Sequence, residues 1–463
     1  MRIYGLLAIF FIILGSSPLS GSAQILDDIP FEDIPRPGGA DEIRRIVDQA
    51  IREHHERMDR LRAERKGWFD RQAIAGHTIE VVPDGATLLQ KRLESIRSAQ
   101  KSIYLSTFIF DSDETGLQIA KALCLKAKQG VDVRILVDSF GSKKFYNGYA
   151  DRMRNCGAGI LLFNPPAWGL NVIAYVIHEK ILVIDGETVH LGGNGMQNSY
   201  HHVQPAHKFF HDIDVKIQGP VACWFHKKFI ETYRESRMWD SPPDVLGSGG
   251  RSEQYEDFLF GDRSYEDCDE KTFGDAKVVP VYGNPLFSKK RPLFETYVDA
   301  FLASEGEIKL YSPYFVPHDG FLAALLWARK NNIKVTIMTN SIESNDEGTG
   351  VLVAMVYRIG KLVKAGVDIR LWKGPYTLHR KAGIYDGKWA YVGSDNLDSR
   401  GHKYSSESVA FSNDRNFVER INQEYDTDLQ NTMPITRDYM RRILETQSSF
   451  KRWMIEKILV DFF

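Results

Sequence analysis

The sequence predicts an α/β protein built from two similar halves, each with a mixed, largely parallel sheet. Three observations lead to this fold class. Apolar runs of strand length alternate with amphipathic segments of helical length. A short motif of His, Lys and Asp occurs at residues 178–185 and again at 379–386. The elements expected before each motif follow one another in the same order. We therefore expect a duplicated fold with the active site between the halves.

Each copy of the motif predicts a β-hairpin. The copies read His178-Glu-Lys180-Ile-Leu-Val-Ile-Asp185 and His379-Arg-Lys381-Ala-Gly-Ile-Tyr-Asp386. Each is followed by a glycine, and six residues separate the Asp from the small pair Gly192-Gly193 or Gly393-Ser394. An Asp-Gly pair between two apolar runs is a strong hairpin signal. Residues i and i+2 of a strand share a face, so the His and Lys of each copy point the same way.

An imidazole beside an ammonium group suits an anion with an electrophilic centre, and phosphate is the obvious choice. We expect one histidine to attack phosphorus and the other to protonate the leaving group. Lys180 and Lys381, with Ser394 and Asn396 as substrate-binding residues, are expected to hold the phosphate oxygens. The two remaining motif residues, Asp185 and Asp386, are an odd number of residues from their histidines. They are therefore expected to support the hairpins.

These motifs are the signature of the phospholipase D superfamily, which the chain resembles over roughly residues 84–430. The resemblance is greatest to the bacterial cardiolipin synthase branch. Further segments that resemble this branch are Thr107-Phe-Ile-Phe110, Val133–Asp138, Phe210–Pro220, Tyr311–Pro317, Thr339-Asn340-Ser341 and Asn396–Arg400. The resemblance implies a duplicated phospholipase D-type fold, a phosphohistidine intermediate and no metal or other cofactor. It also implies that His178 is the nucleophile and His379 the acid/base.

Three further candidates depend on the family pattern. Asp212 and Glu407 each follow a motif at a similar place and are candidates to fix the tautomer of a histidine. The alternative is that both are ordinary strand-end or surface carboxylates. Asn194 is a candidate phosphate ligand, but the asparagine lies one position earlier than in the second copy, where Gly393-Ser-Asp precedes Asn396. The role of Asn194 is therefore open.

Composition limits the function classes. The 463 residues are 43% apolar and 26% charged, with a net charge of −2. This balance argues against a general basic surface, so we expect no nucleic-acid partner. The four cysteines form no C-x-x-C pair and leave three disulfide pairings open. The histidines at 201, 202, 207 and 211 favour an entrance lid over a metal site. The oligomeric state is not indicated.

The chain divides into six predicted segments. Residues 1–23 have the cationic, apolar and small-residue regions of a signal peptide. A linker and N-terminal helix (24–75), the first half (76–240), a flexible connection (241–277), the second half (278–430) and a C-terminal helical segment (431–463) follow. We expect export to a bacterial periplasm or cell envelope, peripheral to the membrane. An uncleaved N-terminal anchor is the alternative. The cationic and apolar C-terminal segment fits either a membrane surface or packing on the domain.

These features favour a phosphatidyltransferase that acts on phospholipids at a membrane surface. The reaction that the resemblance implies joins two phosphatidylglycerols into cardiolipin and releases glycerol. A phospholipase D that hydrolyses phospholipids, and a nuclease or other phosphodiesterase of the superfamily, are the alternatives. A non-enzymatic binding protein is disfavoured because both motifs are complete. The acceptor depends on the shape of the pocket and stays open.

Overall fold

The computed structural model describes residues 67–164, 175–239 and 268–460, with a few residues between 53 and 64. The expected signal peptide, the linker and most of the flexible connection lie outside the described residues. The chain divides into two compact units, Met1–Lys66 and Gly67–Phe463. The second unit contains both motifs and is described below.

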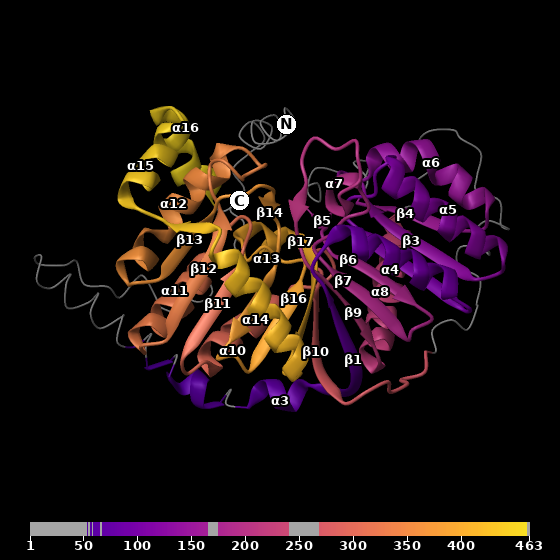
Figure 1. Cartoon of the computed structure of the whole chain (residues 1–463), viewed down its shortest axis with the longest axis horizontal. Helices are drawn as coiled ribbons and strands as arrows, with labels where there is room; N and C mark the ends of the chain where they lie inside the picture. Colours follow the sequence, from indigo (N-terminus) through magenta and orange to yellow (C-terminus); the bar gives the residue numbers. More distant parts are fainter. Residues whose placement is uncertain are drawn as a thin grey trace, which may run out of the picture. The chain divides into compact units, whose positions relative to one another are not determined.

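One continuous sheet runs through both halves of this unit (Figure 1). In the first half the strand order is β1-β9-β7-β6-β2-β3-β4, and in the second half it is β10-β17-β16-β15-β11-β12-β13, with β18 added at the edge. β1 and β10 join the halves as an antiparallel pair, with Ile74 opposite Val278. Read outward from this pair, the two orders are equivalent. The predicted duplication is therefore confirmed.

The strands of the first half are β1 (Ile74–Val82), β2 (Ser102–Thr107), β3 (Asp132–Asp138), β4 (Gly159–Phe163), β5 (Val176–Ile177), β6 (Lys180–Ile184), β7 (Thr188–Gly192), β8 (Phe210–His211) and β9 (Asp214–Gln218). Those of the second half are β10 (Ala276–Gly283), β11 (Glu307–Tyr311), β12 (Lys334–Asn340), β13 (Asp368–Trp372), β14 (Thr377–Leu378), β15 (Ala382–Tyr385), β16 (Trp389–Gly393), β17 (Ser405–Ser412) and β18 (Thr432–Pro434).

The sheet is mixed, as predicted, but the expectation that parallel pairs dominate is wrong. Along the strand order above, the parallel pairs are β2–β3–β4 and β11–β12–β13. The motif hairpins and the strands between them pair antiparallel. Parallel neighbours need a long crossover, whereas a tight turn makes neighbours antiparallel. The two motif hairpins and the strands that join them therefore make the sheet largely antiparallel.

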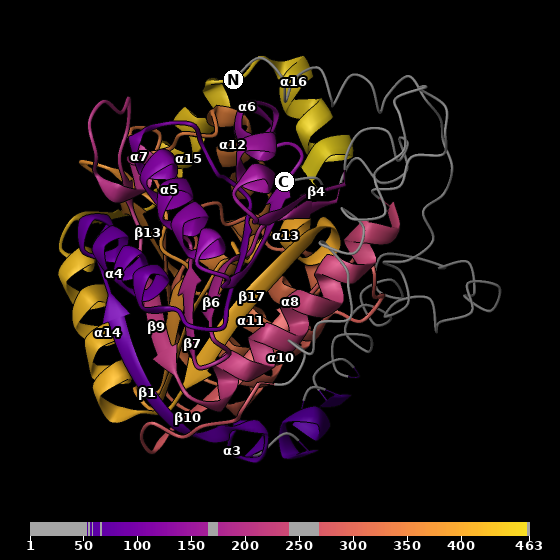
Figure 2. The same ribbon diagram turned by 90° about the vertical axis from the view of Figure 1, so that its right-hand side faces the viewer.

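Helices cover both faces of the sheet (Figure 2). Those of the first half are α3 (Trp68–Gln72), α4 (Gly85–Ser98), α5 (Glu114–Lys128), α6 (Lys143–Asn155), α7 (Asn198–His201) and α8 (Pro220–Trp239). Those of the second are α10 (Pro292–Ala303), α11 (Asp319–Lys330), α12 (Thr349–Lys364), α13 (Ser399–Tyr404), α14 (Arg415–Leu429), α15 (Arg437–Glu445) and α16 (Ser449–Met454), which continues as a π-helical turn, Ile455–Leu459. No helix in the described part of the chain is long and apolar enough to span a membrane.

The two halves share a hydrophobic core. One buried cluster combines residues of α8 and α14 with residues of strands from both halves. It includes Phe225 of α8, Ile421 of α14, and Val189 and Val392 at the centre of the sheet. Burial of this kind contributes about 25 cal/mol per Å² of apolar surface. The shared core fixes the relative position of the two motif hairpins.

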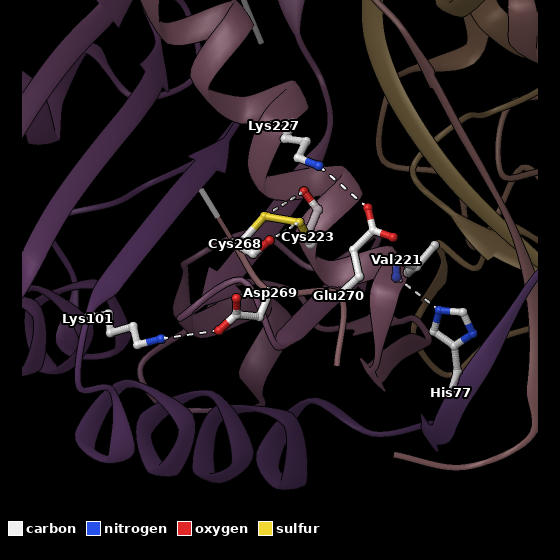
Figure 3. Close-up of a disulfide and its surroundings, with 8 residues drawn as sticks. All are labelled: His77, Lys101, Val221, Cys223, Lys227, Cys268, Asp269 and Glu270. Carbon is white, nitrogen blue, oxygen red and sulfur yellow. Dashed lines mark hydrogen bonds and ion pairs between the residues drawn. A yellow bond between two sulfur atoms is a disulfide. The ribbon is translucent and has the colours of Figure 1, made fainter. Parts of the chain in front are cut away.

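The cysteines form two disulfides, which settle the pairing that the sequence left open. Cys124 of α5 bonds to Cys156 at the end of α6. Cys223 of α8 bonds to Cys268, at the end of the interdomain connection. Next to the second bond, Asp269 and Glu270 form ion pairs with Lys101 and Lys227 (Figure 3). This short segment therefore ties the connection to the first half.

Candidate active site

Both motif hairpins have the predicted Asp-Gly turn. Asp185 and Gly186 have φ of 55° and 67°, and Asp386 and Gly387 have φ of 54° and 62°. Two consecutive positive φ angles define the type I′ turn, whose twist matches that of the strands it joins. The sequence therefore encodes each hairpin locally.

The motif aspartates hold their hairpins from the end opposite the histidines. Asp185 accepts hydrogen bonds from the main-chain N–H groups of residues 100, 101 and 102, at 2.7–2.9 Å. Asp386 accepts the equivalent bonds from residues 305, 306 and 307, at 2.7–2.8 Å. Each carboxylate thus connects a hairpin turn to the start of the neighbouring strand. The structure does not bring either aspartate to the reacting groups.

His178 meets a carboxylate from the second half. The short strand β5 pairs in parallel with the start of β17, and the His178 N–H donates to the Ser406 carbonyl at 2.9 Å. This pairing places the Nδ1 atom of His178 2.7 Å from Oε1 of Glu407. An Nδ1–H donated to a carboxylate leaves Nε2 unprotonated and available as a nucleophile.

His379 meets a carboxylate from the first half in the same way. β14 pairs in parallel with β8, and the His379 N–H donates to the His211 carbonyl at 2.9 Å. The Nδ1 atom of His379 lies 2.6 Å from Oδ2 of Asp212. Each motif histidine is therefore oriented by the opposite half. The structure brings both second-tier candidates, Asp212 and Glu407, to the histidines.

The motif lysines lie between these pairs. Lys180 donates to the carbonyl of His178 at 2.5 Å, and Lys381 to that of His379 at 2.6 Å. Burial lowers the pKa of Lys180 to about 8 and that of Lys381 to about 7. The carboxylates of Asp212 and Glu407 oppose this decrease in pKa at each lysine. The two histidines, two lysines and two carboxylates therefore form one electrostatic cluster.

The histidines are held in the neutral state in the free protein. Burial is the largest cause that lowers the pKa of each imidazole well below its usual value, and the nearby lysines lower it further. Burial also raises the pKa of Asp212 and, more strongly, that of Glu407. A bound phosphodiester would offset the charge of the lysines and so favour a proton on one histidine.

The other predicted binding residues differ in their placement. The Ser394 hydroxyl donates to Oε2 of Glu407 at 2.5 Å, so it holds that carboxylate. The Asn194 amide donates to Asp214 at 2.7 Å, and Asp214 is paired with the buried Arg92 at 2.8 Å. Asn194 therefore uses its amide inside the fold. The Oδ1 atom of Asn396 is buried and has no hydrogen-bond partner among the described residues, which suits a ligand-binding role.

Two residues at strand ends, for which the sequence indicated no role, position the histidines. Asp138, at the end of β3, accepts the N–H of Ile177 at 3.0 Å, directly before His178. Asn340, at the end of β12, accepts the N–H of Leu378 at 3.0 Å and donates to its carbonyl at 2.8 Å, directly before His379. Their signal in the sequence is a polar residue at the same strand end in both repeats.

The histidine-rich loop does not gather around one point. His201 is buried and lies 2.8 Å from the carbonyl oxygen of Gly85. His211 lies 2.9 Å from Asp428, and its ring stacks on Trp372. These histidines therefore have separate partners within the fold.

Comparison with known proteins confirms the resemblance seen in the sequence. A family described as "Cardiolipin synthase, PLD-like domain" matches residues 93–230 and 297–429. The chain is 27% identical to a cardiolipin synthase of Oceanobacillus iheyensis, over 78% of this chain and 70% of the relative. It is 26% identical to the major cardiolipin synthase ClsA of Bacillus subtilis, over 80% and 72%.

Among solved structures, the phosphatidylserine synthase of Haemophilus influenzae has the same fold. It aligns with a TM-score of 0.67 at 17% identity, over 88% of this chain and all of the other.

Proposed function

Because the chain belongs to the family of phospholipase D-like domains of cardiolipin synthase, we propose that it joins two phosphatidylglycerols into cardiolipin and releases glycerol. The observation that supports this proposal most is that each motif histidine contacts a carboxylate from the other half, His178 with Glu407 and His379 with Asp212. It provides two oriented imidazoles in one buried site that also holds two lysines. This is what a double displacement at phosphorus requires.

In the first step, Nε2 of His178 attacks the phosphorus of one phosphatidylglycerol. The N–P bond forms as the P–O bond to the headgroup glycerol breaks. His379 gives its Nε2 proton to that oxygen, and glycerol leaves. Lys180, Lys381 and the Asn396 amide hold the non-bridging oxygens, where negative charge increases in the transition state.

In the second step, a hydroxyl of another phosphatidylglycerol attacks the phosphohistidine. His379 takes the proton of that hydroxyl as the new O–P bond forms and the N–P bond breaks. Cardiolipin leaves, and both histidines return to their initial states. Water in place of the second lipid would make the protein a phospholipase D.

We further propose that the protein acts outside the cytoplasm, at the surface of a membrane. Two disulfides support an oxidising compartment, where such bonds persist. The segment Phe450–Ile458 of α16 and the π-helical turn supports a membrane surface. Its Phe450, Trp453 and Ile458 are exposed, next to Lys451 and Arg452. Exposed aromatic residues with cations are typical of helices that lie on anionic lipid.

The test is turnover of phosphatidylglycerol vesicles by the purified protein, resolved by mass spectrometry. His178→Ala and His379→Ala serve as the inactive variants. Cardiolipin and glycerol in equal amounts, absent with both variants, would establish the transferase. Phosphatidic acid instead of cardiolipin would establish the hydrolase. No turnover of any phospholipid would overturn the proposal.

A further inference from the structure

The two sides of the candidate active site differ in chemistry. Beside His178 lies Phe108, with ring centroids 5.3 Å apart, and Lys180 stands over the same ring. Phe140, which follows the strand end that positions His178, is 40% exposed. Beside His379 lie Phe210 and Tyr200, with ring centroids 5.0 and 5.2 Å from the imidazole, and Tyr314, whose ring meets the imidazole edge-on at 6.2 Å. Aromatic rings therefore flank both histidines, and the second side differs in that two of its rings, those of Tyr200 and Tyr314, are phenols.

Tyr314 holds a carboxylate on this second side. Its hydroxyl donates to Oδ1 of Asp346 at 2.6 Å. The other oxygen, Oδ2, has no hydrogen bond to any described residue. Asp346 also opposes the burial that lowers the pKa of Lys381, so its charge reaches the catalytic cluster. Tyr314 thus holds the Asp346 carboxylate while its ring contacts the imidazole of His379.

Another oxygen without a hydrogen-bond partner among the described residues belongs to Asn396, which follows β16 and contacts the segment that carries Tyr314. Ser312, two residues before Tyr314, donates to the main-chain oxygen of Asn396 at 2.5 Å. Asn396 is 9% exposed, and its Oδ1 atom lacks a partner among the described residues. A buried acceptor without a donor carries a cost of about 1–3 kcal/mol. Asp346 and Asn396 therefore both offer acceptors that a ligand with hydrogen-bond donors would satisfy.

The ligand group must be a donor without charge. A carboxylate repels a phosphate, so Asp346 does not serve the phosphodiester itself. An ammonium group would meet Lys180, Lys381 and Arg400, each of which lowers the pKa of His178 and so lies within electrostatic reach of the site. Hydroxyl groups donate hydrogen bonds and add no charge. They satisfy both constraints.

We infer that Asp346, held by Tyr314, binds the hydroxyl groups of the headgroup and of the acceptor beside His379. The donor lipid would then place its diacylglycerol toward Phe108 and its glycerol headgroup toward Asp346. This rests on the proposed transferase function and adds to it an orientation and a substrate class, the polyol headgroup. This orientation places the leaving oxygen and the attacking hydroxyl at His379, which protonates the first and then accepts the proton of the second.

The test compares Asp346→Asn with Glu343→Gln. Glu343 is a matched control on the same loop, because its carboxylate also accepts from a tyrosine, Tyr439, at 2.7 Å. It is more than half exposed and has no part in the site. Three donors are used with each protein: phosphatidylglycerol, phosphatidylethanolamine and phosphatidyl-p-nitrophenol, whose leaving group has no hydroxyl. The measured quantity is the kcat/KM for phosphatidylglycerol divided by that for the nitrophenyl ester.

We expect this ratio to fall about tenfold or more in Asp346→Asn, because one hydrogen bond to a charged group is lost. The ratio should stay unchanged in Glu343→Gln. An equal fall on both donors would overturn the inference, because Asp346 would then serve only the structure. A wild type that prefers phosphatidylethanolamine, with the loss confined to that donor, would also overturn it. If the wild type cleaved only the nitrophenyl ester, the proposed function would fail instead.

Discussion

The Nδ1 atom of His379 lies 2.6 Å from Oδ2 of Asp212, which belongs to the other half of the protein. The reciprocal contact joins His178 to Glu407 at 2.7 Å. Each half supplies the carboxylate that contacts the histidine ring of the other half. Formation of the catalytic pair is therefore coupled to docking of the two halves, through the β5–β17 and β8–β14 pairings.

Replacement of the orienting carboxylates will lower turnover without loss of the fold. In Asp212→Asn and Glu407→Gln the amide no longer selects the Nδ1–H tautomer, so Nε2 is left in the wrong state. We expect a loss in kcat of about 100- to 10,000-fold, the range for disrupted acid–base catalysis.

The two variants can be separated by trapping the phosphohistidine with radiolabelled donor. Glu407→Gln should slow formation of the adduct on His178, whereas Asp212→Asn should also slow its breakdown. Circular dichroism controls for folding. Full activity in either variant would show that the observed hydrogen bond does not orient the histidine during turnover.

The catalytic lysines will limit activity at alkaline pH. Burial lowers the pKa of Lys381 to about 7 and that of Lys180 to about 8, so the ammonium groups are present below these values and lost above them. The kcat/KM reports the free enzyme and should fall as pH rises through 7 to 8. Bound phosphodiester stabilises the ammonium groups, so the decline in kcat should occur at higher pH. A kcat/KM that is constant to about pH 9 would contradict the lowered pKa of both lysines.

The motif aspartates will affect stability more than chemistry. Asp185 and Asp386 each accept three main-chain N–H groups. At about 1 kcal/mol for each bond, replacement of either by Ala should lower the free energy of unfolding by about 2–3 kcal/mol. Urea titration measures this change.

Because the two turns have equivalent geometry, Asp185→Ala and Asp386→Ala should lower the free energy of unfolding by similar amounts. The kcat of the protein that remains folded should fall only several-fold. His178→Ala is the opposite control, since it should abolish turnover and leave the urea midpoint nearly unchanged. A loss of turnover as large as that of His178→Ala, in a folded Asp185→Ala variant, would assign the aspartate to the chemistry.

The sequence predicted what is encoded locally or by repetition. The hairpins follow from Asp-Gly between apolar runs, and the His and Lys positions follow from the period of a strand. The contacts of Glu407 with His178 and of Asp212 with His379 join segments more than 160 residues apart in the sequence. Local sequence patterns carry no information on such contacts. The direction of neighbouring strands was also not predicted correctly, because a run of apolar residues is typical of strands in both parallel and antiparallel sheets. Asn194 stayed an open candidate for the phosphate because its buried partner, Asp214, cannot be identified from spacing.

The Cys223–Cys268 disulfide will support the first catalytic hairpin. A Cβ atom on Gly186, in the hairpin turn, would lie 2.5 Å from Cβ of Cys268, and Lys271 pairs with Glu187 at 2.5 Å. The disulfide closes a loop with a sequence separation of 45, for which chain entropy predicts a contribution of about 4 kcal/mol. Replacing both cysteines by Ser should lower the melting temperature and reduce kcat several-fold.

The matched control is the corresponding Ser variant of Cys124 and Cys156, whose separation of 32 predicts nearly the same stabilisation. That bond joins α5 to the end of α6, away from the motif turn, so its loss should lower stability and leave the kcat of folded protein unchanged. Equal effects of both variants on kcat would mean that the Cys268 segment does not support the hairpin.

The exposed side of α16 will determine binding to anionic membranes. Phe450 and Trp453 are 67% and 52% exposed, and their rings lie 6.3 Å apart. Ile455 on the opposite side is buried. The helix is therefore attached by one side and presents the other. Burying each aromatic side chain in lipid contributes about 1.5–3 kcal/mol. Phe450→Ala with Trp453→Ala should weaken binding to phosphatidylglycerol vesicles by about 100-fold or more in a sedimentation assay.

Phe273→Ala is the control, because Phe273 is 40% exposed and lies outside α16. It should bind vesicles as the wild type does. Lys451→Gln with Arg452→Gln should weaken binding mainly at low salt, since charge attraction is screened over about 10 Å at 0.1 M. Turnover of a soluble short-chain phosphatidylglycerol should be the same in all these variants, because the catalytic cluster lies on other elements. Unchanged vesicle binding in the double Ala variant would exclude α16 as the membrane contact and leave support of the π-helical turn, which packs on α12, as its role.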